Sequence, residues 1–110
     1  MSLKRFAALA LFAGSLSTAA LADDPADLWK AKCKGCHGDD GKAHTKIGEK
    51  EKIPDFTTDK WQKEMAADAD IKKVITDGSD SNSKMKPFKE KLSEQEIDAL
   101  VKYIRGMKGK

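Results

Sequence analysis

The sequence contains few of the residues that hold small proteins together. Only two of its 110 residues are cysteines, three are prolines and 6% are aromatic, and the mean hydropathy is −0.62. Two cysteines exclude a disulfide-dense scaffold, and the length indicates one small domain rather than a large catalytic chain. The 21 basic and 18 acidic residues nearly cancel, so we do not expect the strongly basic face that binds nucleic acid.

The first 22 residues have the pattern of a secretory signal peptide. Lys4 and Arg5 precede an apolar run, and the segment ends in Ala20-Leu21-Ala22, an A-x-A sequence of the kind that signal peptidase cleaves. Small and hydroxyl residues interrupt the run well short of the ~20 residues that span a bilayer. We therefore expect residues 1–22 to be cleaved, residues 23–110 to form one domain without stable membrane insertion, and the protein to reside in a bacterial periplasm.

The domain that remains has a small apolar inventory. Apolar residues make up 39% of the whole chain, and the leader takes a large share of them. Domains of this size usually supplement their core with disulfides, a metal or another cross-link. We therefore expect a bound apolar cofactor to supply part of the interior.

Local sequence signals predict an all-α fold with four short helices and no strand. Asp24 followed by Pro25 is a typical helix start, and Ser93 followed three residues later by Glu96 is a capping box. Behind this box, apolar residues recur at helical spacing and form one stripe. The predicted helices run from residue 24 toward 33, from 57 or 58 through 65, from 68 to 77 before Gly78, and from 93 until Gly106 or Gly109.

One short motif carries chemistry. Cys33-Lys34-Gly35-Cys36-His37 reads C-x-x-C-H, the attachment sequence for c-type haem. Two thiols about one helical turn apart can each form a thioether with a vinyl group on the same edge of the porphyrin. His37 then brings its imidazole under the iron, for which neutral imidazole is a good ligand. The motif predicts one covalently attached haem c.

Two other interpretations of the motif have to be weighed. A bare C-x-x-C pair also occurs in thiol oxidoreductases and in zinc sites. A thioredoxin-like protein would show alternating strands and helices around the motif, and no strand is predicted here. Zinc would need two further ligands, and beyond His37 the chain has only His44. Haem attachment is favoured, and titratable free thiols in the mature protein would indicate the dithiol alternative.

The second axial position on the iron decides between electron transfer and ligand activation. The candidates are Met65, Met85, Met107 and His44. Met107 would lie at a fraying helix end. Met65 lies in a predicted helix, where a methionine is more often a core residue than an iron ligand. His44 would have to pass round the porphyrin edge only seven residues after His37. Met85 follows a polar loop and precedes Lys86-Pro87, where proline favours rigid, extended geometry. We therefore predict Met85 as the distal ligand.

Taken together, these motifs resemble those of small, soluble bacterial monohaem cytochromes c of class I, with His/Met ligation. The resemblance rests on Leu28-Trp29, the C-x-x-C-H motif, Pro54-Asp55-Phe56, Met85-Lys86-Pro87-Phe88, and Leu92-Ser93 leading to Tyr103. It implies four short helices around one haem c, thioether anchors at Cys33 and Cys36, and iron ligands at His37 and Met85. It also implies that Trp29 and Tyr103 meet where the first and last helices cross. The sequence departs from the family pattern in two places. Lys86 separates Met85 from Pro87, and no proline follows closely after the C-x-x-C-H motif to accept the imidazole proton with its carbonyl. Pro54 is the only proline between His37 and Met85.

With both axial positions filled by protein, the iron keeps no open place for a substrate. The resemblance thus implies a periplasmic one-electron carrier rather than an enzyme. A haem enzyme or gas sensor would require Met85 to leave the iron, and rapid carbon monoxide binding by reduced protein would indicate it. We expect a monomer whose partners are redox proteins, acidic at the docking surface if lysines surround the haem edge. The lysines near the two ligands are Lys30, Lys32, Lys34, Lys84, Lys86, Lys89 and Lys91.

Overall fold

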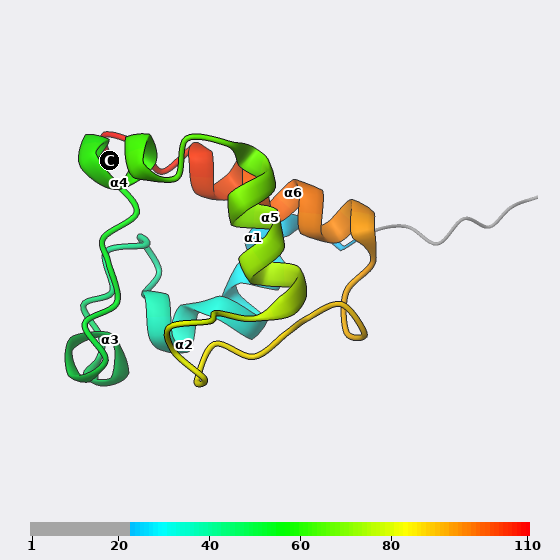
Figure 1. Cartoon of the computed structure of the whole chain (residues 1–110), viewed down its shortest axis with the longest axis horizontal. Coiled ribbons are helices and arrows are strands. Elements are labelled where there is room, and N and C mark those ends of the chain that lie inside the picture. Colours follow the sequence, from blue (N-terminus) through cyan, green and yellow to red (C-terminus); the bar gives the residue numbers. More distant parts are fainter. Residues whose placement is uncertain (1–22) are drawn as a thin grey trace, which may run out of the picture.

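The computed structural model describes residues 23–110, and the predicted leader at residues 1–22 lies outside them. Every regular element in residues 23–110 is a helix and none is a strand (Figure 1), which confirms the predicted all-α class. No helix in this part of the chain combines the length and the apolar content that a membrane crossing needs.

The first helical segment carries the C-x-x-C-H motif on its last turns. It consists of α1 (Pro25–Leu28), η1 (Trp29–Cys33) and α2 (Lys34–His37), which follow one another without a break. Asp24 caps its start, as predicted, by accepting a hydrogen bond from the Ala26 amide at 2.8 Å. η1 is a wider π-helical stretch, of a kind often found at functional sites. The segment continues to His37, beyond its predicted end near Cys33.

α3 (Lys46–Lys50) is a helix that the sequence did not predict. The Thr45 hydroxyl caps its start and accepts from the Gly48 amide at 2.7 Å. Its apolar side chain, Ile47, is 41% exposed, so no apolar stripe marks this helix in the sequence. Residues 23–110 therefore contain five helical segments rather than the predicted four.

The three remaining helices lie where the sequence predicted them, and two of them begin at their predicted capping residues. They are α4 (Asp59–Glu64), α5 (Asp68–Asp77) and α6 (Glu94–Arg105). The Thr58 hydroxyl caps α4, and Ser93 and Glu96 form the predicted capping box at the start of α6. Gly78, at φ +85°, ends α5, and Gly106 caps the end of α6.

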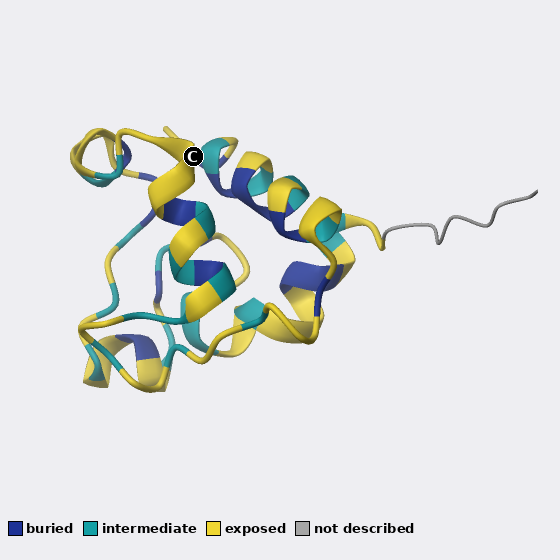
Figure 2. Ribbon diagram, turned by 45° about the vertical axis from the view of Figure 1, so that its right-hand side comes forward, coloured by how far each residue is buried: buried dark blue, intermediate teal, exposed yellow. Residues whose placement is uncertain are grey.

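α6 packs against both α1 and α5, and Figure 1 shows these two helices beside it. Its stripe of Ile97, Leu100, Val101 and Ile104 is buried, and Figure 2 shows the buried positions along one side of this helix. The rings of Trp29 and Tyr103 lie 5.6 Å apart between centroids. The first and last helical segments therefore meet through these two aromatic residues, as the resemblance implied.

Arg105 fixes α4 against α6. Its guanidinium donates to the Gln62 carbonyl and side-chain oxygens at 3.1 and 2.9 Å, to the Met65 carbonyl, and to Asp68 at 2.7 Å. The Gln62 amide group in turn donates to the Phe56 carbonyl at 2.7 Å. Because these bonds satisfy carbonyls at the end of α4, they hold the whole stretch from residue 56 to 65 in place.

Met107 does not lie at a fraying end, so that part of the sequence interpretation is wrong. The residue is 6% exposed, and its sulfur packs closely on Gly41. The Gly109 amide donates to the Thr57 carbonyl at 2.8 Å. This bond fastens the chain beyond α6 to the body of the domain and leaves Met107 in the core.

Candidate functional site

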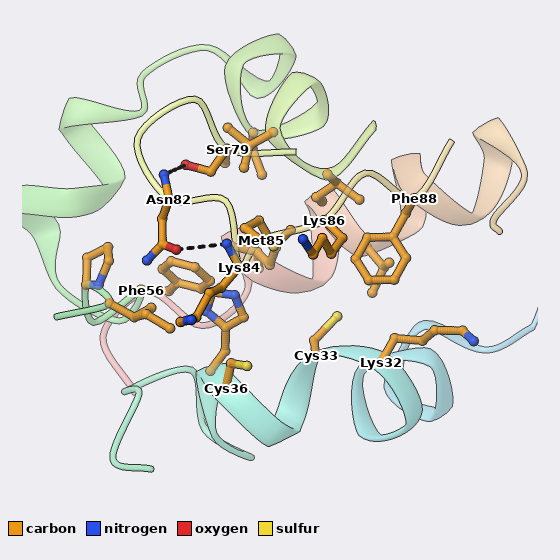
Figure 3. A pocket seen from close by; sticks show the side chains of 18 of the residues that line it. Lys32, Cys33, Cys36, Phe56, Ser79, Asn82, Lys84, Met85, Lys86 and Phe88 are labelled. Atoms are coloured by element: carbon orange, nitrogen blue, oxygen red, sulfur yellow. Dashed lines mark hydrogen bonds between the residues drawn. The ribbon is translucent and has the colours of Figure 1, made fainter. Parts of the chain in front are cut away.

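A cavity of about 500 Å³ lies between the C-x-x-C-H motif and the loop that follows α5. The four residues predicted to hold the cofactor, Cys33, Cys36, His37 and Met85, all contribute to its lining. Figure 3 shows Cys33 and Cys36 pointing into the cavity from the helical segment, with Met85 on the loop across from them. The volume is in the usual range for cofactor sites.

His37 lies in apolar surroundings on the inner wall. Its ring centroid is 4.8 Å from that of Phe56 and 5.8 Å from that of Trp29. Burial lowers the pKa of His37 from 6.5 to about 4, so the imidazole is neutral near pH 7, the form that binds a metal. Its Nδ1 atom is buried and has no hydrogen-bond partner in residues 23–110. Pro54 therefore does not accept the imidazole proton.

The peptide carbonyls at the end of the motif are held by side chains from other turns. The Trp29 indole donates to the Gly38 carbonyl at 2.8 Å in a buried position. The Thr45 hydroxyl donates to the Cys36 carbonyl at 2.7 Å. Since helix ends leave carbonyls without partners, these two bonds stabilise the turn by which the chain leaves the motif.

The two thiols are half-buried and are not joined in a disulfide. Burial, with a smaller effect from Cys36, raises the pKa of the Cys33 thiol to about 11. Nucleophilic thiols of oxidoreductases have lowered pKa values, and no strand flanks the motif in the described part of the chain. These features disfavour the thiol oxidoreductase interpretation.

Metal binding by protein side chains alone finds no support in residues 23–110. This stretch contains no group of three or more His, Cys, Asp or Glu side chains placed to hold a metal ion. His44 is exposed and does not line the cavity. The zinc interpretation therefore lacks the further ligands it needs, and His44 is not placed as a rival axial ligand.

Two of the candidate methionines, Met65 and Met85, line the cavity, whereas Met107 does not. The backbone around Met85 is closed by two hydrogen bonds: the Met85 amide donates to the Asn82 carbonyl at 3.1 Å, and the Ser79 amide donates to the Met85 carbonyl at 3.2 Å. Met85 is thus presented on a hydrogen-bonded loop.

The cavity walls are largely apolar. Phe56 and Trp61 stack with ring centroids 4.2 Å apart, and both line the cavity together with Ile53 and Phe88. A buried neutral imidazole, a thioether and two unbonded thiols on an apolar cavity are the donors that haem c requires. The residues present therefore fit this cofactor.

Lysines surround the cavity, but not all of those named from the sequence. The lining lysines are Lys32, Lys52, Lys84, Lys86 and Lys91, and we refer to them as the lysine collar. None of the five is in an ion pair within residues 23–110. Lys30, Lys34 and Lys89 do not line the cavity, and Lys34 pairs with Asp39 at 3.6 Å. Sequence reasoning missed Lys52, which precedes the lining residue Ile53.

The chain matches a family model described as cytochrome C oxidase, cbb3-type, subunit III, over residues 20–104. It is similar to the solved structure of the KustC0563 c-type cytochrome, with 38% sequence identity and a TM-score of 0.70, over 78% of this chain and 99% of that chain. A structure of a mutant of KustC0563 is similar at 38% identity and a TM-score of 0.68, over 78% of this chain and 100% of that one. No curated protein matches the sequence.

Proposed function

We propose that this chain is a periplasmic carrier, which takes one electron from one redox protein and passes it to another. The chain belongs to the c-type cytochrome family, as shown by its match to the model of cbb3-type oxidase subunit III. Proteins of this family bind haem c covalently and transfer electrons, so the chain is an electron-transfer protein rather than an enzyme. The periplasmic location is supported by the leader pattern at residues 1–22.

The observation that carries this proposal is that the four residues singled out in the sequence line one apolar cavity. We assign Cys33 and Cys36 as the thioether anchors, His37 as the proximal iron ligand and Met85 as the distal one. His37 supports this assignment because burial keeps its imidazole neutral. Met85 is supported by its position on the loop across the cavity from the thiols (Figure 3).

When bound, haem c supplies an iron that gains or loses one electron. The chain's own residues set the conditions for that change. If His37 and Met85 both held the iron, no position would be left for a substrate, which favours a carrier over a gas sensor. The apolar walls formed by side chains such as Phe56 and Trp61 exclude water and disfavour the extra positive charge of the ferric state. Together with thioether ligation they raise the reduction potential.

The proposal is tested on protein expressed in cells that mature c-type cytochromes. We expect a coloured protein that carries covalent haem, has no titratable thiol, and shows a weak methionine-to-iron absorption band when oxidised. Met85→Ala should abolish that band, lower the potential and let carbon monoxide bind the reduced protein rapidly. Met65→Ala is the matched control, because it removes a methionine from the same cavity. A colourless product, or loss of the band in the Met65 variant instead, would contradict these assignments.

The lysine collar supports an acidic docking partner. Its five exposed lysines come from three separate parts of the chain and have no ion-pair partners in residues 23–110. An excess of charge of one sign around a redox centre raises the encounter rate with oppositely charged partners more than their affinity. We therefore infer that the collar steers the acidic face of a redox partner toward the cavity.

Small charged oxidants test this steering without the natural partner. Lys84→Gln, Lys86→Gln and Lys91→Gln combined should slow oxidation of the reduced protein by the hexacyanoferrate(III) anion about tenfold at low salt. A cationic cobalt(III) complex should react faster with the same variant. The control combines the same change at Lys60, Lys63 and Lys102, which are exposed and lie outside the cavity lining. Equal effects of the two triple variants would contradict steering by the collar.

A further inference from the structure

The loop that presents Met85, residues 78–88, is attached to α5 at its ends. We call it the distal loop. The Phe88 and Lys89 amides donate to the Ile75 and Thr76 carbonyls at 2.9 and 3.2 Å, and the other end begins at Gly78 directly after α5. The loop between these ends contains neither a helix nor a strand. Its position over the cavity therefore depends on what else it contacts.

Between residues 79 and 86, one hydrogen bond joins the distal loop to another part of residues 23–110. The Asn82 side-chain amide donates to a Glu51 carboxylate oxygen at 3.2 Å. All other hydrogen bonds in this stretch join residues of the loop to one another. Both Asn82 and Glu51 are part of the cavity lining, so the bond connects two sides of the cavity.

Asn82 also organises the loop from within. Its side-chain oxygen accepts from the Lys84 amide at 2.9 Å, and its backbone carbonyl accepts from the Met85 amide at 3.1 Å. Its own amide donates to the Ser79 hydroxyl at 3.2 Å, and Figure 3 shows the bonds to Ser79 and Lys84. A carboxamide can accept and donate at the same time. Asn82 therefore fixes the backbone just before Met85 and ties it to Glu51.

Glu51 belongs to the part of the chain that follows the C-x-x-C-H motif. It caps the end of α3, where its amide donates to the Ile47 carbonyl at 2.8 Å. α3 packs against α2, and the Thr45 hydroxyl that caps α3 also bonds to the Cys36 carbonyl. The Asn82–Glu51 bond thus links the loop that carries Met85 to the segment that carries the two thiols.

We propose that Asn82 is a positioning residue that holds Met85 on the iron by latching the distal loop to Glu51, and that opening this latch admits external ligands. The inference rests on the proposed function, in which Met85 is the distal ligand. It specifies what controls ligand access in a carrier whose iron is otherwise closed. The latch is the single, partly buried hydrogen bond from the Asn82 amide group to the Glu51 carboxylate. One such bond favours the closed loop, but it can also break and let the loop open.

Exchanging donor and acceptor gives a sharp test. Asn82→Asp keeps an acceptor for the Lys84 amide but places a carboxylate against Glu51. We expect imidazole to bind the ferric holoprotein about tenfold faster, with a weaker methionine-to-iron band. Glu51→Gln leaves an oxygen to accept from Asn82 and should behave like the unaltered protein. Combining the two changes restores a donor opposite an acceptor with reversed polarity, so imidazole binding should slow again to within about twofold of the original rate.

Two controls separate the latch from other causes. Ser83→Ala alters an exposed residue of the same loop that forms no side-chain hydrogen bond in residues 23–110, and it should change neither the rate nor the band. Met85→Ala tests the proposed ligand itself. If Met85→Ala opens the iron while Asn82→Asp alone and Asn82→Asp with Glu51→Gln bind imidazole equally fast, the latch is refuted and the ligand assignment stands. If Met85→Ala has no effect on the band, the proposed distal ligand fails.

Discussion

Gly78 is the residue on which the start of the distal loop depends, and Gly78→Ala is the sharpest test of its backbone. The residue has φ +85° and ψ 172°, a region that is almost confined to glycine. A Cβ added there would lie 2.9 Å from the Met85 carbonyl oxygen and 3.2 Å from the Pro87 nitrogen. Both contacts are backbone atoms, which cannot rotate away as the end of a side chain could.

The expected loss of stability follows from these two effects. Holding a residue with a side chain in this conformation costs ~1–3 kcal/mol, and the contact with the Met85 carbonyl adds to it. We expect Gly78→Ala to lower the free energy of unfolding by about 3 kcal/mol. Because the contacts fall on the distal loop, we also expect the methionine-to-iron band to be lost at a lower denaturant concentration than global helical structure.

Two other glycines separate backbone strain from crowding. Gly109 has φ +79° and would have open space around a Cβ, whereas Gly35 has open space and no positive φ. We expect Gly109→Ala to cost about 1 kcal/mol and Gly35→Ala to be neutral or to stabilise by up to ~1 kcal/mol. The assay is denaturant unfolding of the holoprotein, followed by circular dichroism and by the ferric band. If Gly78→Ala costs no more than Gly109→Ala and leaves the band intact, the close approach of the loop to α5 is refuted.

Two further predictions concern the packing of α6. Hydrogen bonds from the backbone nitrogen of Ser93 and then from that of Asp23 lower the pKa of Glu96 below its usual 4.5. A carboxylate whose pKa is lowered by folding stabilises the protein above pH 4.5, and this stabilisation is lost as the pH falls through the folded-state pKa. Thermal melting should therefore show Glu96→Gln to be less stable than the unaltered protein at about pH 6, with the difference vanishing in acid. A difference that grew on acidification would contradict the capping geometry. Arg105→Ala should cost about 2 kcal/mol in denaturant unfolding, since it removes bonds to the end of α4 as well as the pair with Asp68, whereas Asp68→Ala alone should cost much less.

The parts of the fold predicted from the sequence are those whose cause is local. α6 follows from a capping box and an apolar stripe, and the end of α5 follows from Gly78. α3 has only the Thr45 cap, because its apolar residue is exposed and leaves no periodic signal. Met107 was placed wrongly because its burial depends on a contact with Gly41, which is far away in the chain and invisible to any local pattern.

The same distinction applies to the site. Cys33, Cys36 and His37 stand together in the sequence, so their spacing was enough to predict them. Met85 was predicted from the polar loop before it and from Pro87 two residues after it. Their roles as anchors and ligands stay predictions, now supported by one cavity that all four line. Lys52 and the Asn82–Glu51 bond could not be predicted, because both depend on how two distant loops lie around that cavity.

The cavity and the hydrophobic core are built from the same side chains. Of the eleven residues in the buried apolar cluster, seven also line the cavity: Trp29, Phe56, Ile71, Ile75, Leu92, Leu100 and Ile104. A core residue normally has packed neighbours on every side, and a haem in the cavity would add neighbours on the face that each of these seven residues turns toward it. The small apolar inventory of the sequence is therefore balanced by an interior that protein and haem share. A cofactor that binds reversibly stabilises a protein less as the concentration of free cofactor falls. A covalently attached haem does not dissociate, so its contribution to the core does not depend on that concentration. We therefore expect cofactor binding and folding to depend on each other in this chain, with the C-x-x-C-H motif contributing to both.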